Sequence, residues 1–107
     1  MAKIATTIEQ SQQLAEILPL ESADMYWSFG NIKFMDNDYD SNVVQHIPSW
    51  SLAALLSLIP EVSLNTFKDG KWNAMIQSDG KMIYTDKDNP VDACYEMIIS
   101  LHEQNLI

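Results

Sequence analysis

The segment from Tyr84 to Ile107 constrains the fold more than any other, because it predicts a capped amphipathic helix that needs a partner layer. Asn89 is a good N-cap, and Pro90 stands at the first helical position, where its missing N–H costs nothing. The apolar spacing of one buried helical face is followed by Val91, Cys94, Tyr95, Ile98 and Leu101. We expect Asp92, Glu96 and Glu103 to face water on the other side, and Asn105 to end the helix in a left-handed conformation. The rest of the chain must therefore supply an apolar surface for this helix.

Two further helices are expected upstream. Thr6 and Glu9 form a capping-box pattern for a helix that runs to about Leu18, before Pro19. Ser49 caps a second helix over 50–59, which is apolar nearly all round and which we expect to be the most buried helix, at the centre of the core.

Strand patterns fill the remaining segments. The expected strands are Met25–Phe29, Ile32–Met35, Val43–Ile47, Leu64–Lys68, Lys71–Gln77 and Lys81–Thr85. Asp69-Gly70 predicts a two-residue hairpin turn, and Ser78-Asp79-Gly80 predicts a second turn. Along one strand Trp72, Ala74 and Ile76 point one way, but composition leaves open which face meets the core. The whole pattern predicts one α+β domain over residues 1–107. Its antiparallel sheet has about four to six strands, and its three helices pack mainly on one face.

Charge and composition exclude several classes of protein. The formal net charge is −9, and the basic residues are six lysines with no arginine, which disfavours a nucleic-acid partner because phosphate neutralisation supplies most of that affinity. No segment approaches the ~18 continuous apolar residues of a membrane span, and the N-terminal residues lack the apolar region of a signal peptide. The single Cys94 cannot form an internal disulfide, which fits a reducing cytoplasm.

Three patches of the chain resemble a known family. They are Ala23-Asp24-Met25-Tyr26-Trp27, the segment from Pro48 to Pro60, and the segment from Asp88 to His102. In this order they resemble small uncharacterised proteins of gut anaerobic bacteria and of their phages and prophages. The resemblance covers nearly the whole chain and implies a genomic context, but it brings no catalytic residues.

The sequence predicts no catalytic residue, no cofactor site and no metal site. Asp36, Asp38 and Asp40 match the first ligands of a calcium loop. The pattern then fails, because Ser41 replaces the required glycine and Ile47 the required glutamate. Cys94 lies on the buried face of the C-terminal helix. Its neighbours Asp92 and Glu96 oppose formation of a thiolate, so we expect a core thiol and not a nucleophile. His102 is about 12 Å beyond Cys94 at the ~1.5 Å rise per residue, and no ligand spacing joins it to His46.

The expected interaction surface consists of Trp72, Asp92, Glu96 and Glu103. Trp50 is expected in the core, whereas Trp72 beside the Asp69-Gly70 turn is the tryptophan expected to be most exposed.

Three functions remain open. The first is a non-enzymatic accessory or interaction protein of a phage or mobile element, which binds a protein partner or a second copy of itself. The second is a small enzyme that works through carboxylates alone. The third is an acidic DNA mimic whose row of carboxylates would be Asp86, Asp88, Asp92, Glu96 and Glu103.

Overall fold

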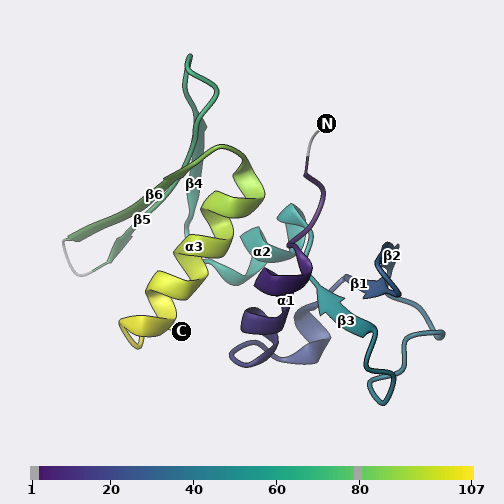
Figure 1. Cartoon of the computed structure of the whole chain (residues 1–107). Helices are drawn as coiled ribbons and strands as arrows, with labels where there is room; N and C mark the ends of the chain where they lie inside the picture. The colour runs from purple at the N-terminus through teal and green to yellow at the C-terminus, as the bar shows by residue number, and fades with distance from the viewer. Residues whose placement is uncertain (1–2, 79–80) are drawn as a thin grey trace.

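The computed structural model describes residues 3–78 and 81–107 and shows an α+β fold (Figure 1). In chain order the elements are α1 (Ile8–Ala15), the 3-10 turn η1 (Leu20–Ser22), β1 (Met25–Ser28), β2 (Asn31–Phe34), β3 (His46–Ser49), α2 (Leu52–Leu58), β4 (Ser63–Thr66), β5 (Trp72–Ser78), β6 (Lys81–Lys87) and α3 (Pro90–Glu103). The strands of these described residues form two antiparallel three-stranded sheets, in the orders β2-β1-β3 and β4-β5-β6. The α+β class was predicted, and six strands fall within the expected four to six, but they are divided between two sheets instead of forming one.

The C-terminal helix α3 follows the prediction closely. Asn89 Oδ1 accepts the N–H of Asp92 at 2.8 Å, with Pro90 at the first helical position. All five residues of the predicted buried face are buried, and α3 lies against β5 and β6. At its C-terminal end Asn105 has a φ of +58°. The N–H of Asn105 donates to His102 O and that of Leu106 to Leu101 O, which is the Schellman arrangement.

The core is centred on α3 and not on α2, so the prediction for the second helix was wrong in this respect. Seven residues of α3 are buried, against Ala54 and Leu55 of α2. The helix also begins later than expected, because Ser51 and not Ser49 is its N-cap and accepts the N–H of Ala54 at 3.2 Å. Ser49 instead belongs to β3, where it pairs with Met25.

The β4–β5 hairpin confirms the predicted pairing but not the tight turn. Its loop spans 67–71, and the Phe67 N–H donates to Lys71 O at 2.9 Å. Gly70 has a φ of +87°, the conformation that favours glycine, and Asp69 Oδ1 accepts the N–H of Lys71. Ala74 and Ile76 are buried, so this face of β5 meets the core. The other predicted turn falls on residues 79 and 80, outside the described part of the chain.

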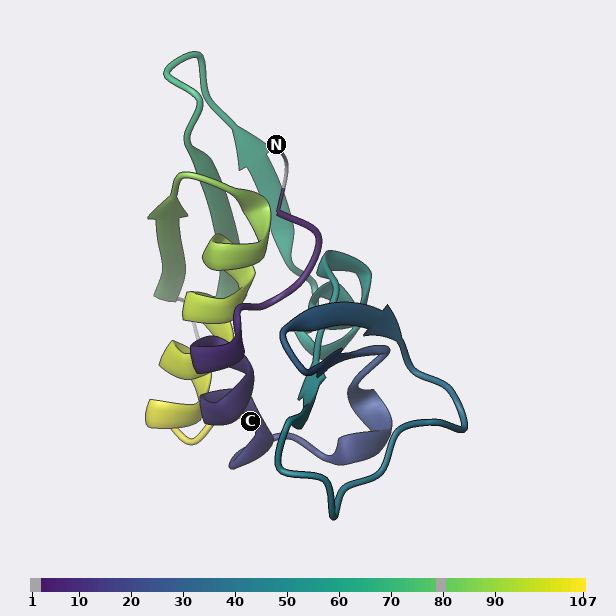
Figure 2. The same ribbon diagram turned by 45° about the vertical axis from the view of Figure 1, so that its right-hand side comes forward.

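Helix α1 begins one residue later than expected and ends earlier. Thr7 and Gln10 form the capping box in place of Thr6 and Glu9, and the helix ends at Ala15. Thr6 is unavailable as a cap because its backbone and side chain bond to Trp50: the Thr6 N–H donates to Trp50 O at 3.0 Å. Figure 2 shows the N-terminal segment and α1 between α3 and the β1–β3 sheet.

A long loop joins the two edge strands of the β1–β3 sheet, β2 and β3. The strand expected at 43–47 begins only at His46, because residues 35–45 form turns held by two aspartates. Asp36 Oδ1 accepts the hydroxyl of Tyr26 at 2.9 Å and the N–H of Asp38 at 3.0 Å. Asp40 Oδ1 accepts the N–H of Asn42. Among the described residues, none of the helices has both the length and the apolar character needed to cross a bilayer.

Candidate interaction surface

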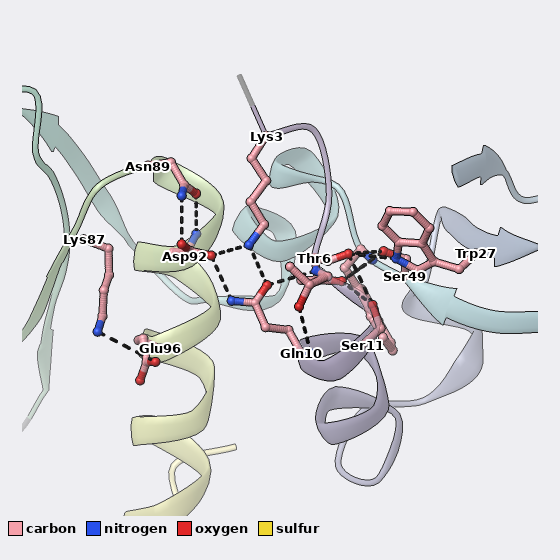
Figure 3. Close-up of polar contacts among 12 residues, drawn as sticks. Lys3, Thr6, Gln10, Ser11, Trp27, Ser49, Lys87, Asn89, Asp92 and Glu96 are labelled. Carbon is pink, nitrogen blue, oxygen red and sulfur yellow. Dashed lines mark hydrogen bonds and ion pairs between the residues drawn. The ribbon is translucent and has the colours of Figure 1, made fainter. Parts of the chain in front are cut away.

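A buried cluster of hydroxyl groups fixes the N-terminal segment to the rest of the molecule (Figure 3). Thr6, Ser11 and Ser49 have no exposed surface. Thr6 Oγ1 lies 2.7 Å from Ser11 Oγ and 3.0 Å from Ser49 Oγ, and it accepts the N–H of Trp50 at 3.2 Å. The cluster joins segments that come from distant parts of the sequence, so it holds α1 against β3.

Trp27 on β1 is held by the same cluster. Its indole Nε1 donates to Thr6 O at 3.0 Å, and Ser49 Oγ donates to the same carbonyl at 3.1 Å (Figure 3). Across the sheet its neighbours are Ile32 on β2 and Ile47 on β3. The side chain is half-buried, so part of the fixed indole remains open to a partner.

Two adjoining hollows meet at Trp27. One, of about 400 Å³, is lined by Thr7, Ile8, Glu9 and Trp27. The other, of about 270 Å³, is lined by Lys3, Ile4, Ala5, Thr7, Trp27 and Ile32. We call the residues that line these two hollows the Trp27 groove.

The Trp27 groove continues into exposed apolar surface. Ile4 is 57% exposed, and Phe34, next to Met25 on the same sheet face as Trp27, is 77% exposed. An apolar concavity with a fixed aromatic side chain and few polar groups is the usual form of a binding site. It is the strongest candidate site in the described part of the chain.

A second exposed apolar area lies on the face of the β4–β6 sheet that is turned away from α3. Met82 is 59% and Tyr84 61% exposed. The adjacent hollow is smaller, about 200 Å³, and is lined by Glu61, Ser63, Met75, Ile76, Gln77 and Met82. Flexible methionines line this hollow, and it contains no hydrogen-bonded aromatic group, so we rank it below the Trp27 groove.

The four residues of the sequence-predicted surface are not all exposed. Trp72 is half-buried and packs against the core from the start of β5. Trp27 is half-buried too, and only Trp50 is fully buried, as predicted. Glu103 is exposed at the end of α3. Glu96 lies 3.9 Å from Lys87 Nζ.

Asp92 does not face water freely, contrary to the expectation. Its Oδ1 accepts from Lys3 Nζ and from Gln10 Nε2, and its Oδ2 accepts from Asn89 Nδ2 at 2.8 Å (Figure 3). Burial acts to raise the pKa of this carboxyl, but the hydrogen bonds from Gln10, Lys3 and Asn89 and the charge of Lys3 outweigh it, so the pKa is lowered from 3.8. Asp92 therefore holds the N-terminal segment and α1 against α3.

Replacing Asp92 by asparagine is expected to lower the free energy of unfolding by about 1–3 kcal/mol near neutral pH, because an amide cannot accept from three donors. A carboxyl with a depressed folded-state pKa stabilises above its unfolded pKa, and this contribution is lost as pH falls through the folded value. Urea unfolding at several pH values should thus show a difference between the two proteins that is constant above about pH 5 and shrinks below about pH 4.

Glu103→Gln on the same helix is the control, since Glu103 is exposed, and we expect a change within about 0.5 kcal/mol. A difference between wild type and Asp92→Asn that persists unchanged at low pH would show that the carboxylate charge is not the source of the stabilisation.

Three carboxylates of the acidic row are paired with lysines. Lys3 pairs with Asp92, Lys71 Nζ lies 3.0 Å from Asp88 Oδ1, and Lys87 is near Glu96. Asp86 Oδ1 accepts the Asn73 amide at 2.8 Å. These partners reduce the negative potential along the row, which weakens the case for DNA mimicry.

The Asp36–Asp40 loop uses its carboxylates to hold its own backbone. The described residues contain no group of three or more His, Cys, Asp or Glu side chains placed to hold a metal ion. Asp36 and Asp40 instead accept backbone N–H groups within the loop, at 3.0 and 2.9 Å.

The fold creates a serine–histidine pair that the sequence did not indicate, because it depends on the register of β1 and β3. Ser28 Oγ lies 3.2 Å from His46 Nε2. His46 Nδ1 accepts the backbone N–H of Asp40 at 3.0 Å. A nitrogen that accepts carries no proton, so in the neutral ring the proton is on Nε2 and donates to Ser28. A serine-activating histidine needs the opposite tautomer, so the pair holds the loop and does not generate a nucleophile.

Cys94 is fully buried in α3, as predicted. Burial raises the pKa of its thiol from 9.0 to about 11. A rise of this size leaves roughly one hundredth of the thiolate at a given pH below both values, and thiolate is the reactive form.

We therefore expect Ellman's reagent at pH 8 to react with folded protein at least about 100-fold more slowly than with urea-unfolded protein. The time course of absorbance measures both rates. Rapid reaction without denaturant would contradict the buried placement of Cys94.

The described hollows give no support to an enzyme that works through paired carboxylates. Two of them contain one carboxylate each, Glu9 in one and Glu61 in another, and the third is lined by none. A carboxylate-only hydrolase needs two such groups within about 5–10 Å across one site. Comparisons of the chain with protein-family models, with curated proteins and with solved structures returned no match.

Proposed function

We propose that this chain is a non-enzymatic interaction protein of a phage or other mobile element, and that it binds a protein partner through the Trp27 groove. The genomic context rests on the family resemblance of the three sequence patches. Action in the bacterial cytoplasm is part of the proposal, since Cys94 is a free thiol.

The observation that carries the proposal is the fixed, partly open indole of Trp27 within an apolar groove. The hydrogen bond from Nε1 to Thr6 O holds the ring before any partner arrives. Binding a partner then loses little side-chain conformational entropy, because the ring is already ordered. Tryptophan in such a setting is a frequent source of binding energy. Ile4 and Ile32 extend the apolar contact on one side of the ring.

Affinity capture from a host that carries the gene tests the proposal. Wild type is compared with Ile4→Lys, which places a positive charge in the groove at a position already 57% exposed and so should leave the fold intact. We expect a partner that binds wild type and is lost with Ile4→Lys, and reconstitution from the two purified proteins should reproduce this loss.

Val44→Lys is the matched control, because Val44 is 86% exposed and lies outside the groove. Capture of the same partner by all three proteins would place the interface elsewhere, for example on the face that contains Glu103. Failure to recover any partner, together with concentration-dependent self-association by sedimentation, would replace the proposal with a homo-oligomer.

A further inference from the structure

The charges around the Trp27 groove specify the chemistry of what it binds. We infer that the groove accepts an arginine-bearing segment of a partner protein, with the guanidinium over the Trp27 ring and paired with the carboxylate of Glu9. The inference rests on the proposed function and names the partner's chemistry at the same site.

Glu9 supplies a negative charge at the groove. It lies in the first turn of α1, is exposed, and lines the same hollow as Trp27. The other formal charge of the groove is that of Lys3, and Lys3 Nζ is already bound by Asp92 of α3 and by Gln10 of α1 (Figure 3). Within the described residues, the charge that the groove offers a partner is therefore the negative charge of Glu9.

Trp27 supplies an aromatic ring beside this charge. The face of an indole attracts cations, and tryptophan is the most effective aromatic residue for this contact. Arginine fits both neighbours, because its planar guanidinium stacks on the ring while its N–H groups bond to a carboxylate. The aliphatic stem of the same side chain suits the apolar wall that Ile8 provides.

The whole molecule adds long-range attraction. A net charge of −9 on 107 residues draws basic partners and repels acidic ones, and this steering weakens with salt. An acidic peptide would meet repulsion from Glu9 at the groove, and a purely apolar segment would leave that carboxylate unused. A basic segment therefore fits the groove better than either.

The test uses ¹⁵N-labelled protein and the probe acetyl-Leu-Arg-Leu-amide, followed through the indole Nε1–H resonance of Trp27. The matched probe carries citrulline in place of arginine, which keeps the shape and removes the charge. We expect the arginine probe to shift the Trp27 resonance and to bind about tenfold more tightly than the citrulline probe, since the latter loses both the cation–ring contact and the ion pair. Added salt should reduce this difference in affinity between the two probes.

Glu9→Gln should weaken binding of the arginine probe about threefold, which is the usual size of one exposed ion pair. Glu16→Gln, at the other end of α1 and outside the groove, should leave it unchanged. Equal binding of the two probes overturns the inference, as does an equal loss in Glu9→Gln and Glu16→Gln, which would indicate bulk charge. Absence of any Trp27 shift at millimolar probe also overturns it. If the arginine probe fails while a captured partner remains sensitive to Ile4→Lys, the groove is the interface and only its cation chemistry is wrong.

Discussion

Thr6→Val is expected to lower the free energy of unfolding by about 2–4 kcal/mol, although valine has nearly the same shape as threonine. The hydroxyl of Thr6 accepts the N–H of Trp50 and lies within hydrogen-bond distance of Ser11 and Ser49. All four residues are fully buried, so no water can replace the lost bond. The cost is the desolvation of the groups left without a partner, which exceeds the net value of a single hydrogen bond.

Thr66→Val is the control for this change, since Thr66 is an exposed residue of β4 and its hydroxyl lies 3.5 Å from Lys71 O. We expect this control to alter the unfolding free energy by less than about 0.5 kcal/mol. Urea unfolding followed by tryptophan fluorescence measures both variants.

A double-mutant cycle with Ser49→Ala then separates the cluster from general packing. Because Thr6 and Ser49 share one network, the two losses should not add, and the coupling should exceed about 0.5 kcal/mol. Additive losses would mean that the hydroxyl groups act independently. In that case the cluster does not hold α1 to β3 as a unit.

The parts of the fold that the sequence predicts are those fixed by signals close together in the chain. For α3, the cap at Asn89, the proline at Pro90, the apolar stripe and the terminator at Asn105 all lie within one segment, and each acts as expected. The face of β5 that meets the core was left open by the sequence, and the structure shows that it is the face of Ala74 and Ile76.

The predictions are wrong where two nearby residues could each cap a helix and a contact with a distant residue determines which one does. Thr6 and Thr7 are equally good caps by composition, but Thr6 bonds to Trp50, so Thr7 caps α1. Ser51 rather than Ser49 caps α2, because Asp24 binds both the N–H and the hydroxyl of Ser51. Neither choice can be read from local propensity, because each depends on a contact across at least 27 residues.

The candidate site also depends on contacts between distant parts of the chain. The Trp27 groove is assembled from the N-terminal segment, the start of α1 and strands β1 and β2, and no spacing in the sequence indicates that they meet. The aromatic-rich strand around Trp27 was the available signal, and its alternation alone could not show that the indole would be half open. The Asp92 network was missed for a related reason, since Lys3 reaches it across 89 positions.

Ile98→Ala is expected to lower the free energy of unfolding by about 3–4 kcal/mol. Ile98 is fully buried on the face of α3 that packs into the core, so removing its outer carbons leaves a cavity as well as a loss of apolar burial. Domains of this size are stable by about 5–15 kcal/mol, so the change removes a large share of the total.

The neighbouring Ile99→Ala gives the matched control, because Ile99 is on the same helix and only half-buried. Both changes gain the same few tenths of a kcal/mol in helix propensity, so the difference between them measures burial alone. We expect Ile99→Ala to cost about 1–2 kcal/mol. If Ile98→Ala is too unstable to measure, Ile98→Val should still cost about 0.5–1.5 kcal/mol. Equal losses at positions 98 and 99 would mean that α3 is not seated on its sheet by the face that contains Ile98, and the core would then have to be centred elsewhere.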